Sequence, residues 1–169
     1  MAYTYSKIAT YTVGSGGVSS MAFLNIPQNY TDLVLKSSIR ATGATSGGFL
    51  TFNGITTGYS EMLLYGTGSA TGSASISLAG LVWVFETVPS TATANTFSNG
   101  EIHIPNYTSS NFKSVSADNV QENNATAADG YLVSGLWSNT SPINSISIAS
   151  GSNFAQHSTF HLYGIKAEL

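Results

Sequence analysis

The sequence predicts an all-β protein, an antiparallel β-sandwich or jelly roll of about ten short strands. Nearly every segment alternates apolar and polar residues with period 2, and no stretch repeats apolar residues at helical spacing. Clusters of Gly, Asn, Ser and Pro separate these segments. Aromatic residues make up 11% of the chain, which excludes the disorder that low charge would otherwise suggest. We expect one sandwich domain over residues 1–169. An up-and-down barrel is the less favoured alternative, because region 105–130 is too irregular for a simple meander.

The first strands follow from alternation and turn residues. Segment 3–13 ends at the "GSGG" turn, and segment 18–24 ends before Pro27, which has no N–H for a strand ladder. In segment 32–41, alternation places Leu33, Leu35 and Ile39 on the core face. The opposite face of that segment carries these residues: Val34, Lys36, Ser38 and Arg40.

The middle of the chain contains the most apolar segment. Segments 48–53 and 60–65 flank an Asn-Gly turn, and the Gly/Ser/Thr/Ala tract 66–77 predicts a long, mobile surface loop. Segment 76–86 is predicted as a strand, and its residues 78–86 are apolar on both faces. We therefore expect a central strand covered by the core on one side and by a loop or another subunit on the other. Trp83 and Phe85 are the residues we expect at such a subunit contact.

The C-terminal half repeats the same pattern. The predicted strands there are 97–104, 112–118, 131–137, 143–149 and 157–166. In the last of them, Phe160 and Leu162 lie on the face opposite His161 and Tyr163.

Composition excludes several classes of function. Charged residues are only 8% of the chain, and the five basic residues are scattered, so binding to nucleic acid is not expected. The chain has no cysteine, which excludes disulfides and thiolate sites. No apolar run reaches the length of a membrane span, and the N-terminus lacks a signal-peptide hydrophobic stretch. We expect a product made in a cytoplasm and not exported by a recognisable signal.

A search for chemistry yields no catalytic or cofactor set, and we expect a protein that is not an enzyme and binds no cofactor. His157 and His161 are four residues apart, which on a strand is about 13 Å, too far to share a metal. The stretch 118–130 offers carboxylates for calcium without the order of an EF-hand. Glu61, Glu86 and Glu101 lie in or beside predicted strands, so two of them could meet as a glycosidase pair, but nothing in the sequence defines their separation.

Carbohydrate binding is the main functional alternative, because sugar sites on sandwiches combine aromatic faces with hydrogen bonds from nearby Asn, Asp or Gln side chains. Aromatic residues on strands also belong to cores or interfaces, so both interpretations stay open. The candidate glycan contacts are Tyr59, Tyr65, Tyr107 and Trp137, with Tyr131 as a further aromatic, and the amides are Asn106, Asn111 and Asn139.

Several segments resemble small structural proteins of tailed bacteriophages, including those of cyanophages. An early strand begins with "IPQNYTDL" (26–33) and the chain closes with "STFHLYGI" (158–165). The resemblance extends over residues 23–42, 94–128, 135–148 and 154–168. Members of this group include head decoration or cement proteins, head fibres, and tail fibre and baseplate components.

The resemblance implies a non-enzymatic virion structural protein, and our first hypothesis is a head decoration (cement) protein on the exterior of the capsid. The alternative is a tail or head fibre domain that binds host-surface glycan. Symmetric particles favour small oligomers, so we expect a homotrimer in contact with the major capsid protein or other virion proteins. On strand parity, the expected interface residues are Lys36, Arg40, Trp83 and Phe85. Neither a membrane nor a nucleic acid is expected as a partner.

Overall fold

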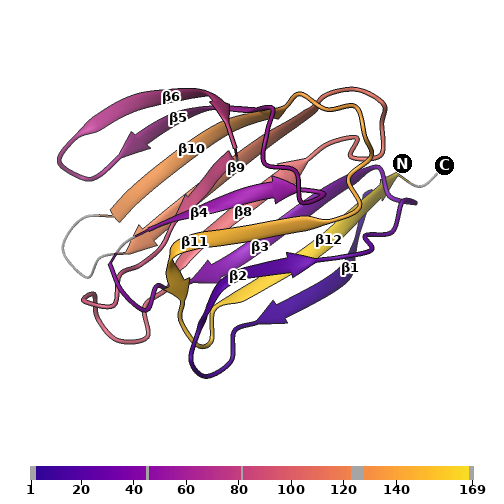
Figure 1. Ribbon diagram of the computed structural model, residues 1–169. Coiled ribbons are helices and arrows are strands. Elements are labelled where there is room, and N and C mark those ends of the chain that lie inside the picture. The colour runs from indigo at the N-terminus through magenta and orange to yellow at the C-terminus, as the bar shows by residue number, and fades with distance from the viewer. Residues whose placement is uncertain (1–2, 45, 81, 123–127, 168–169) are drawn as a thin grey trace.

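The computed structural model describes residues 3–44, 46–80, 82–122 and 128–167 and contains two antiparallel β-sheets packed face to face (Figure 1). The predicted all-β sandwich is therefore confirmed. The described residues contain no helix that is long and apolar enough to cross a membrane. The strands are β1 (Tyr3–Thr12), β2 (Val18–Phe23), β3 (Asp32–Ile39), β4 (Gly47–Phe52), β5 (Tyr59–Gly66), β6 (Thr71–Ala79), β7 (Val82–Glu86), β8 (Ser98–Ile104), β9 (Lys113–Glu122), β10 (Ala128–Trp137), β11 (Ile146–Phe154) and β12 (Thr159–Ala167).

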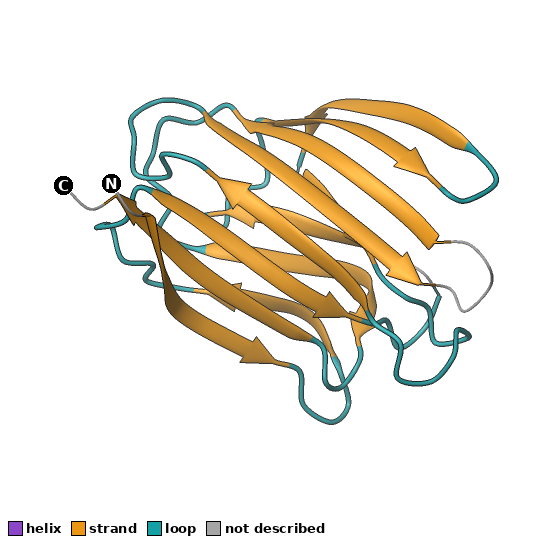
Figure 2. Cartoon of the chain, turned by 180° about the vertical axis from the view of Figure 1, so that it is seen from behind, coloured by secondary structure: helices purple, strands orange, loops and turns teal. Residues whose placement is uncertain are grey.

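The two sheets differ in size. The large sheet has eight strands in the order β1-β12-β3-β8-β9-β10-β5-β6, and the small sheet has four in the order β2-β11-β4-β7. The successive strands β1 and β2, β3 and β4, β7 and β8, and β11 and β12 lie in opposite sheets, which is consistent with a jelly roll. The remaining strands β5, β6, β9 and β10 all join the large sheet at one end (Figure 1), and Figure 2 shows the same two sheets from behind. The large sheet therefore extends past the edge of the small one.

The hydrophobic core lies between the sheets, where the alternation predicted it. Leu33, Leu35 and Ile39 of β3 are fully buried, as are Phe160 and Leu162 of β12. The small sheet contributes Leu50 and Phe52 of β4 and Ile146 and Ile148 of β11 to the same cluster. Full burial of side chains of this size contributes about 1.5–3 kcal/mol each, so this layer is the main source of stability.

One predicted strand is in fact two. Segment 76–86 is divided between β6 and β7, which belong to different sheets, and β7 is the edge strand of the small sheet rather than a central strand. The predicted loop 66–77 is largely strand, because β6 pairs with β5 from Thr71 onward. Ladder hydrogen bonds compensate here for the low strand propensity of Gly, Ser and Ala.

The apolar character of β7 has an explanation within this chain. Val82, Val84 and Phe85 are all fully buried, and β7 contacts β9, β10 and β5 of the large sheet. A bulge between Gly48 and Phe49 in the pairing of β4 with β7 interrupts the strict alternation of β7. The large sheet of the same chain therefore covers Val82, Val84 and Phe85.

Region 105–130 is more regular than predicted. β9 continues to Glu122 and β10 begins at Ala128, so most of the stretch 118–130 is strand. Residues 123–127 of that stretch lie outside the described residues. The antiparallel pairing of β9 with β10 starts at Ala128 opposite Glu122 and continues to Trp137 opposite Lys113.

Candidate functional site

A cleft opens where the large sheet extends past β7, and we call it the aromatic cleft. Its volume is about 340 Å³, which is within the range of small-molecule sites. Residues from both sheets meet in it because β7 is an edge strand and β5 and β10 continue beyond it. The lining residues are Phe49, Glu61, Leu63, Tyr65, Thr67, Trp83, Glu86 and Tyr131.

The aromatic rings of the cleft contact one another across the two sheets. Trp83 of β7 and Tyr131 of β10 meet edge to face with ring centroids 5.1 Å apart. Tyr65, opposite Tyr131 in the ladder, lies with its ring centroid 6.4 Å from that of Tyr131. Gly47 of β4 makes room for the indole, since a Cβ at that position would lie 2.2 Å from Trp83 Nε1. The position of Trp83 therefore depends on a glycine in the neighbouring strand.

Polar side chains of the large sheet satisfy the open edge of β7. The Trp83 backbone N–H donates to Glu61 Oε2 at 2.5 Å, and the Glu86 backbone N–H donates to Asn119 Oδ1 at 2.9 Å. Asn119 is fully buried and also donates from Nδ2 to the Asn99 carbonyl at 2.6 Å. These contacts end the small sheet by satisfying backbone donors that another strand would otherwise pair with.

Two carboxyl groups of the cleft are partly withdrawn from water. Burial raises the pKa of Glu86 to about 7, with a further contribution from the negative charge of Asp129. Burial also raises the pKa of Glu61, although the hydrogen bond from the Trp83 backbone opposes the shift. The pKa values of Glu61 and Glu86 are both raised. Glycoside hydrolysis by two carboxyl groups instead uses one group with a raised pKa and one that stays ionised.

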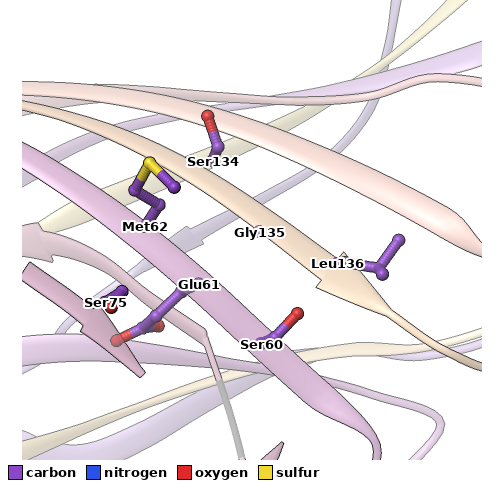
Figure 3. A pocket seen from close by; sticks show the side chains of 7 residues that line it. All are labelled: Ser60, Glu61, Met62, Ser75, Ser134, Gly135 and Leu136. Carbon is purple, nitrogen blue, oxygen red and sulfur yellow. The ribbon is translucent and has the colours of Figure 1, made fainter. Parts of the chain in front are cut away.

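The opposite face of the large sheet carries a second feature, which we call the outer patch. Five large apolar side chains there are exposed, namely Met62, Leu64, Val120, Leu132 and Leu136. They belong to the adjacent strands β5, β9 and β10, where Leu64 is opposite Leu132 and Met62 is opposite Ser134. Figure 3 shows Met62, Ser134 and Leu136 along one of the grooves of this face. Serines, Glu61 and Asp118 surround the apolar side chains in the grooves.

Three of the four predicted glycan contacts belong to the core. Tyr59, Tyr107 and Trp137 are at most 1% exposed, so they present no ring face to a ligand. Tyr59 stacks on Trp137, and its hydroxyl accepts from the Phe52 N–H and donates to the Ile55 carbonyl. The Tyr107 hydroxyl donates to the Pro27 carbonyl. Of the predicted set only Tyr65 lines the cleft.

The four predicted interface residues lie in different environments. Lys36 is exposed on β3 and forms an ion pair with Glu101 at 2.7 Å. Phe85 is fully buried and packs against Phe160 in the core, while Trp83 is half-buried in the aromatic cleft. Arg40 follows β3, and its guanidinium donates to carbonyl oxygens of the segment 90–96. Arg40 therefore supports a loop of its own chain.

No metal centre forms among the parts of the chain that the structure describes. His103 is 3.7 Å from Asp32, and His161 Nδ1 lies 3.0 Å from Thr10 Oγ1. Of the carboxylates considered for calcium, Asp118 lies on the exposed face of β9 and Asp129 accepts a hydrogen bond from Gln121.

The sequence predicted some of the residues that line the aromatic cleft and did not indicate others. Glu61 and Glu86 were candidates for a pair and do line one cleft, whereas Glu101 lies apart with Lys36. Phe49 and the outer patch were not anticipated. A signal for the cleft was present in Gly47-Gly48, since consecutive glycines in a strand indicate close approach by another segment.

Comparison with known proteins adds no relationship to this geometry. No protein-family model matches the chain, and no curated protein matches its sequence significantly.

Proposed function

We propose that this chain is a non-enzymatic structural protein of a tailed-phage virion, a head decoration (cement) protein that docks on the exterior of the capsid. The observation that supports this proposal is the outer patch. Exposed Met62, Leu64 and Leu132 are 53–60% accessible to water on neighbouring strands, and a group of large apolar residues on one face is typical of a protein–protein contact.

The outer patch fits an apolar partner surface. Glu61 and Asp118 are the charged residues among those that line its grooves, and the other polar groups there are hydroxyls and the amide of Asn119. Covering the patch removes apolar surface from water at a gain of about 25 cal/mol per Å². A decoration protein that bridges capsid subunits in this way adds buried area to the shell without chemistry. The occupant we assign to the patch is the major capsid protein.

The oligomer is a separate part of this proposal. Three-fold positions on a capsid favour a homotrimer. Light scattering should therefore give a mass of about three times 17.6 kDa. A monomeric mass would exclude the trimer in solution and leave the docking surface to be tested on particles.

The experiment that tests the docking surface is incorporation into virions of the phage that encodes the chain. We expect the double variant Leu64→Ser/Leu132→Ser to lower the number of copies per particle by at least about tenfold, because it removes apolar area at the centre of the contact. The matched control is Tyr5→Ser/Leu24→Ser, which replaces two other exposed side chains, at 52% and 69%, on β1 at the far edge of the large sheet and directly after β2 of the small sheet. Equal incorporation of both variants would contradict the proposal.

Copy number also separates this proposal from its alternative, a tail or head fibre domain that binds host glycan. Quantitative mass spectrometry of particles should find hundreds of copies of a decoration protein, whereas a handful would indicate a fibre. Tyr59, Tyr107 and Trp137 are buried in the core and cannot contact a glycan, which weakens the fibre alternative. Binding to host polysaccharide on a glycan array would restore it.

A further inference from the structure

The aromatic cleft combines three features. Its rings come from both sheets, with Trp83 on β7 in contact with Tyr131 on the large sheet, and Tyr65 next to Tyr131. The indole and the Tyr131 ring are inclined at 64°, so the rings form two walls of a corner instead of one flat platform. Glu61 and Glu86 complete the lining from the same two sheets.

The charge in the cleft has one sign. No lysine or arginine is among the lining residues, and Asp129 adds negative charge next to Glu86. Three basic side chains have contacts elsewhere: Lys36 pairs with Glu101, Arg40 binds loop carbonyls, and Lys113 donates to the carbonyls of Ser109 and Asn111. Burial, together with Glu86, Asp129 and Tyr65, raises the pKa of Tyr131 to about 12, which keeps its ring neutral. Two partly buried carboxylates without a cation are costly, and a bound cation would offset that cost.

We propose that the aromatic cleft binds an organic ammonium group, held by the faces of Trp83, Tyr65 and Tyr131 and neutralised by Glu86 and Glu61. Aromatic faces attract alkylated ammonium ions, and the attraction is strongest where water is excluded. A cavity of about 340 Å³ accommodates a group of that size. This site goes beyond the virion role and does not depend on it.

The lining favours this ligand over a sugar. Sugar recognition combines an aromatic face with hydrogen bonds from several amide and hydroxyl side chains, to which a carboxylate can be added. The cleft contains no Asn or Gln among its lining residues, and Thr67 is its one neutral aliphatic hydroxyl. Its polarity comes mainly from carboxylates and tyrosine hydroxyls, which select for positive charge.

The test is calorimetric titration with choline, with its neutral carbon analogue 3,3-dimethylbutan-1-ol as the matched ligand. We expect saturable binding of choline at pH 8 and at least about tenfold weaker binding of the neutral analogue, because only choline gains the cation–π and carboxylate contacts. Butylammonium, which imitates a lysine side chain, identifies the source. If butylammonium binds more tightly than choline, the natural ligand is a lysine side chain of a partner protein. If butylammonium binds more weakly, the natural ligand is a quaternary ammonium compound.

Matched variants locate the site. Glu86→Gln should weaken choline binding about tenfold. Glu101→Gln, which removes a carboxylate of the opposite face near Lys36, should leave binding unchanged. Tyr131→Leu should abolish binding, while Tyr131→Phe, which keeps the ring, should retain it. Circular dichroism of each variant confirms the fold before titration.

The pH dependence gives an independent readout. Glu86 is faced by Glu61 and Tyr65 of β5, Tyr131 and Asp129 of β10, and the neutral Asn119 of β9. A pKa of about 7 for Glu86 means that choline affinity should fall up to about tenfold from pH 8 to pH 6, as this carboxylate takes up a proton. The fall should disappear in Glu86→Gln.

Three results would overturn the proposal. These are equal binding of choline and its neutral analogue, no saturable binding of any ammonium up to about 50 mM, and binding that Tyr131→Leu leaves intact. Binding of an oligosaccharide to the cleft without binding of choline would assign the site to glycan instead.

Discussion

At the scale of single residues, polar side chains in this protein mostly support its own backbone. Asn119 and Glu61 accept hydrogen bonds from the edge of β7, and Lys113 Nζ donates to the carbonyls of Ser109 and Asn111. Arg40 does the same for the loop before β8. In a chain with only five basic residues, at least two serve its own loops.

Replacement of Arg40 should therefore cost more stability than replacement of Lys36. Arg40→Ala leaves carbonyls of Ser90, Ala92, Thr93 and Thr96 without their charged donor, and we expect a loss of about 2–3 kcal/mol in the free energy of unfolding. Lys36→Ala removes one exposed ion pair and should cost at most about 1 kcal/mol. Urea unfolding measures both, and equal losses would contradict the structural role of Arg40.

Glu86 should make stability depend on pH. Its pKa rises from an ordinary value of 4.5 to about 7 in the folded chain, so the folded state binds more protons than the unfolded state between these values. Stability from this group is fully present below about pH 4.5 and is lost as the pH rises through about 7. We expect Glu86→Gln to raise the free energy of unfolding at pH 8 by about 1 kcal/mol, a discounted value because water reaches part of the carboxylate.

The same variant should have little effect at pH 4.5, where the carboxyl group is already neutral. Thermal unfolding at the two pH values measures the difference. A gain that is equal at both values would show that the charge of Glu86 is not its cause.

At the scale of elements, β7 determines the shape of the candidate site. It ends the small sheet, its bulge with β4 lets Phe85 reach the core, and its Trp83 turns into the cleft. Both arrangements require the glycine pair of β4. A Cβ at Gly48 would lie 2.0 Å from Phe85 Cε2, closer than any packed contact permits.

Gly48→Ala should consequently destabilise the protein by about 2 kcal/mol or more through overpacking. Gly130→Ala on β10, where a Cβ would meet nothing within 4 Å, is the matched control and should change stability by less than about 1 kcal/mol. Phe85→Leu in the Gly48→Ala background should recover part of the loss, since it removes the clashing ring edge. Chemical unfolding of the three variants decides the matter, and a neutral Gly48→Ala would contradict this account of β7.

At the scale of the whole molecule, the unequal sheets create both candidate surfaces. The four strands of the small sheet cover only part of the eight-stranded sheet. The strands β5, β9 and β10 contribute Tyr59, Val115 and Trp137 to the core and, with β6, extend the large sheet past the edge strand β7. The inner face of the extension forms the aromatic cleft against β7, and its outer face carries the outer patch. A docked partner and a ligand could therefore occupy opposite faces of the same strands.

The sequence by itself determined the fold class and the inner faces of β3 and β12. Alternation is a local property, and a strand buried on one face must keep its apolar residues in register. Leu33, Leu35 and Ile39 were therefore assigned to the core correctly, and the buried Phe160 and Leu162 were correctly separated from His161 and Tyr163. Turn residues likewise located most strand boundaries.

Only the tertiary structure decided which strands are edges and which aromatic residues are covered. The division of 76–86 into β6 and β7, the burial of Tyr59, Tyr107 and Trp137, and the loop contacts of Arg40 all depend on partners far away in the sequence. Alternation of apolar and polar residues indicates that a strand has two different faces, but the order of the strands in the sheets determines what covers each face. The aromatic cleft exists because β7 is the last strand of its sheet, and that is a property of pairing between distant segments.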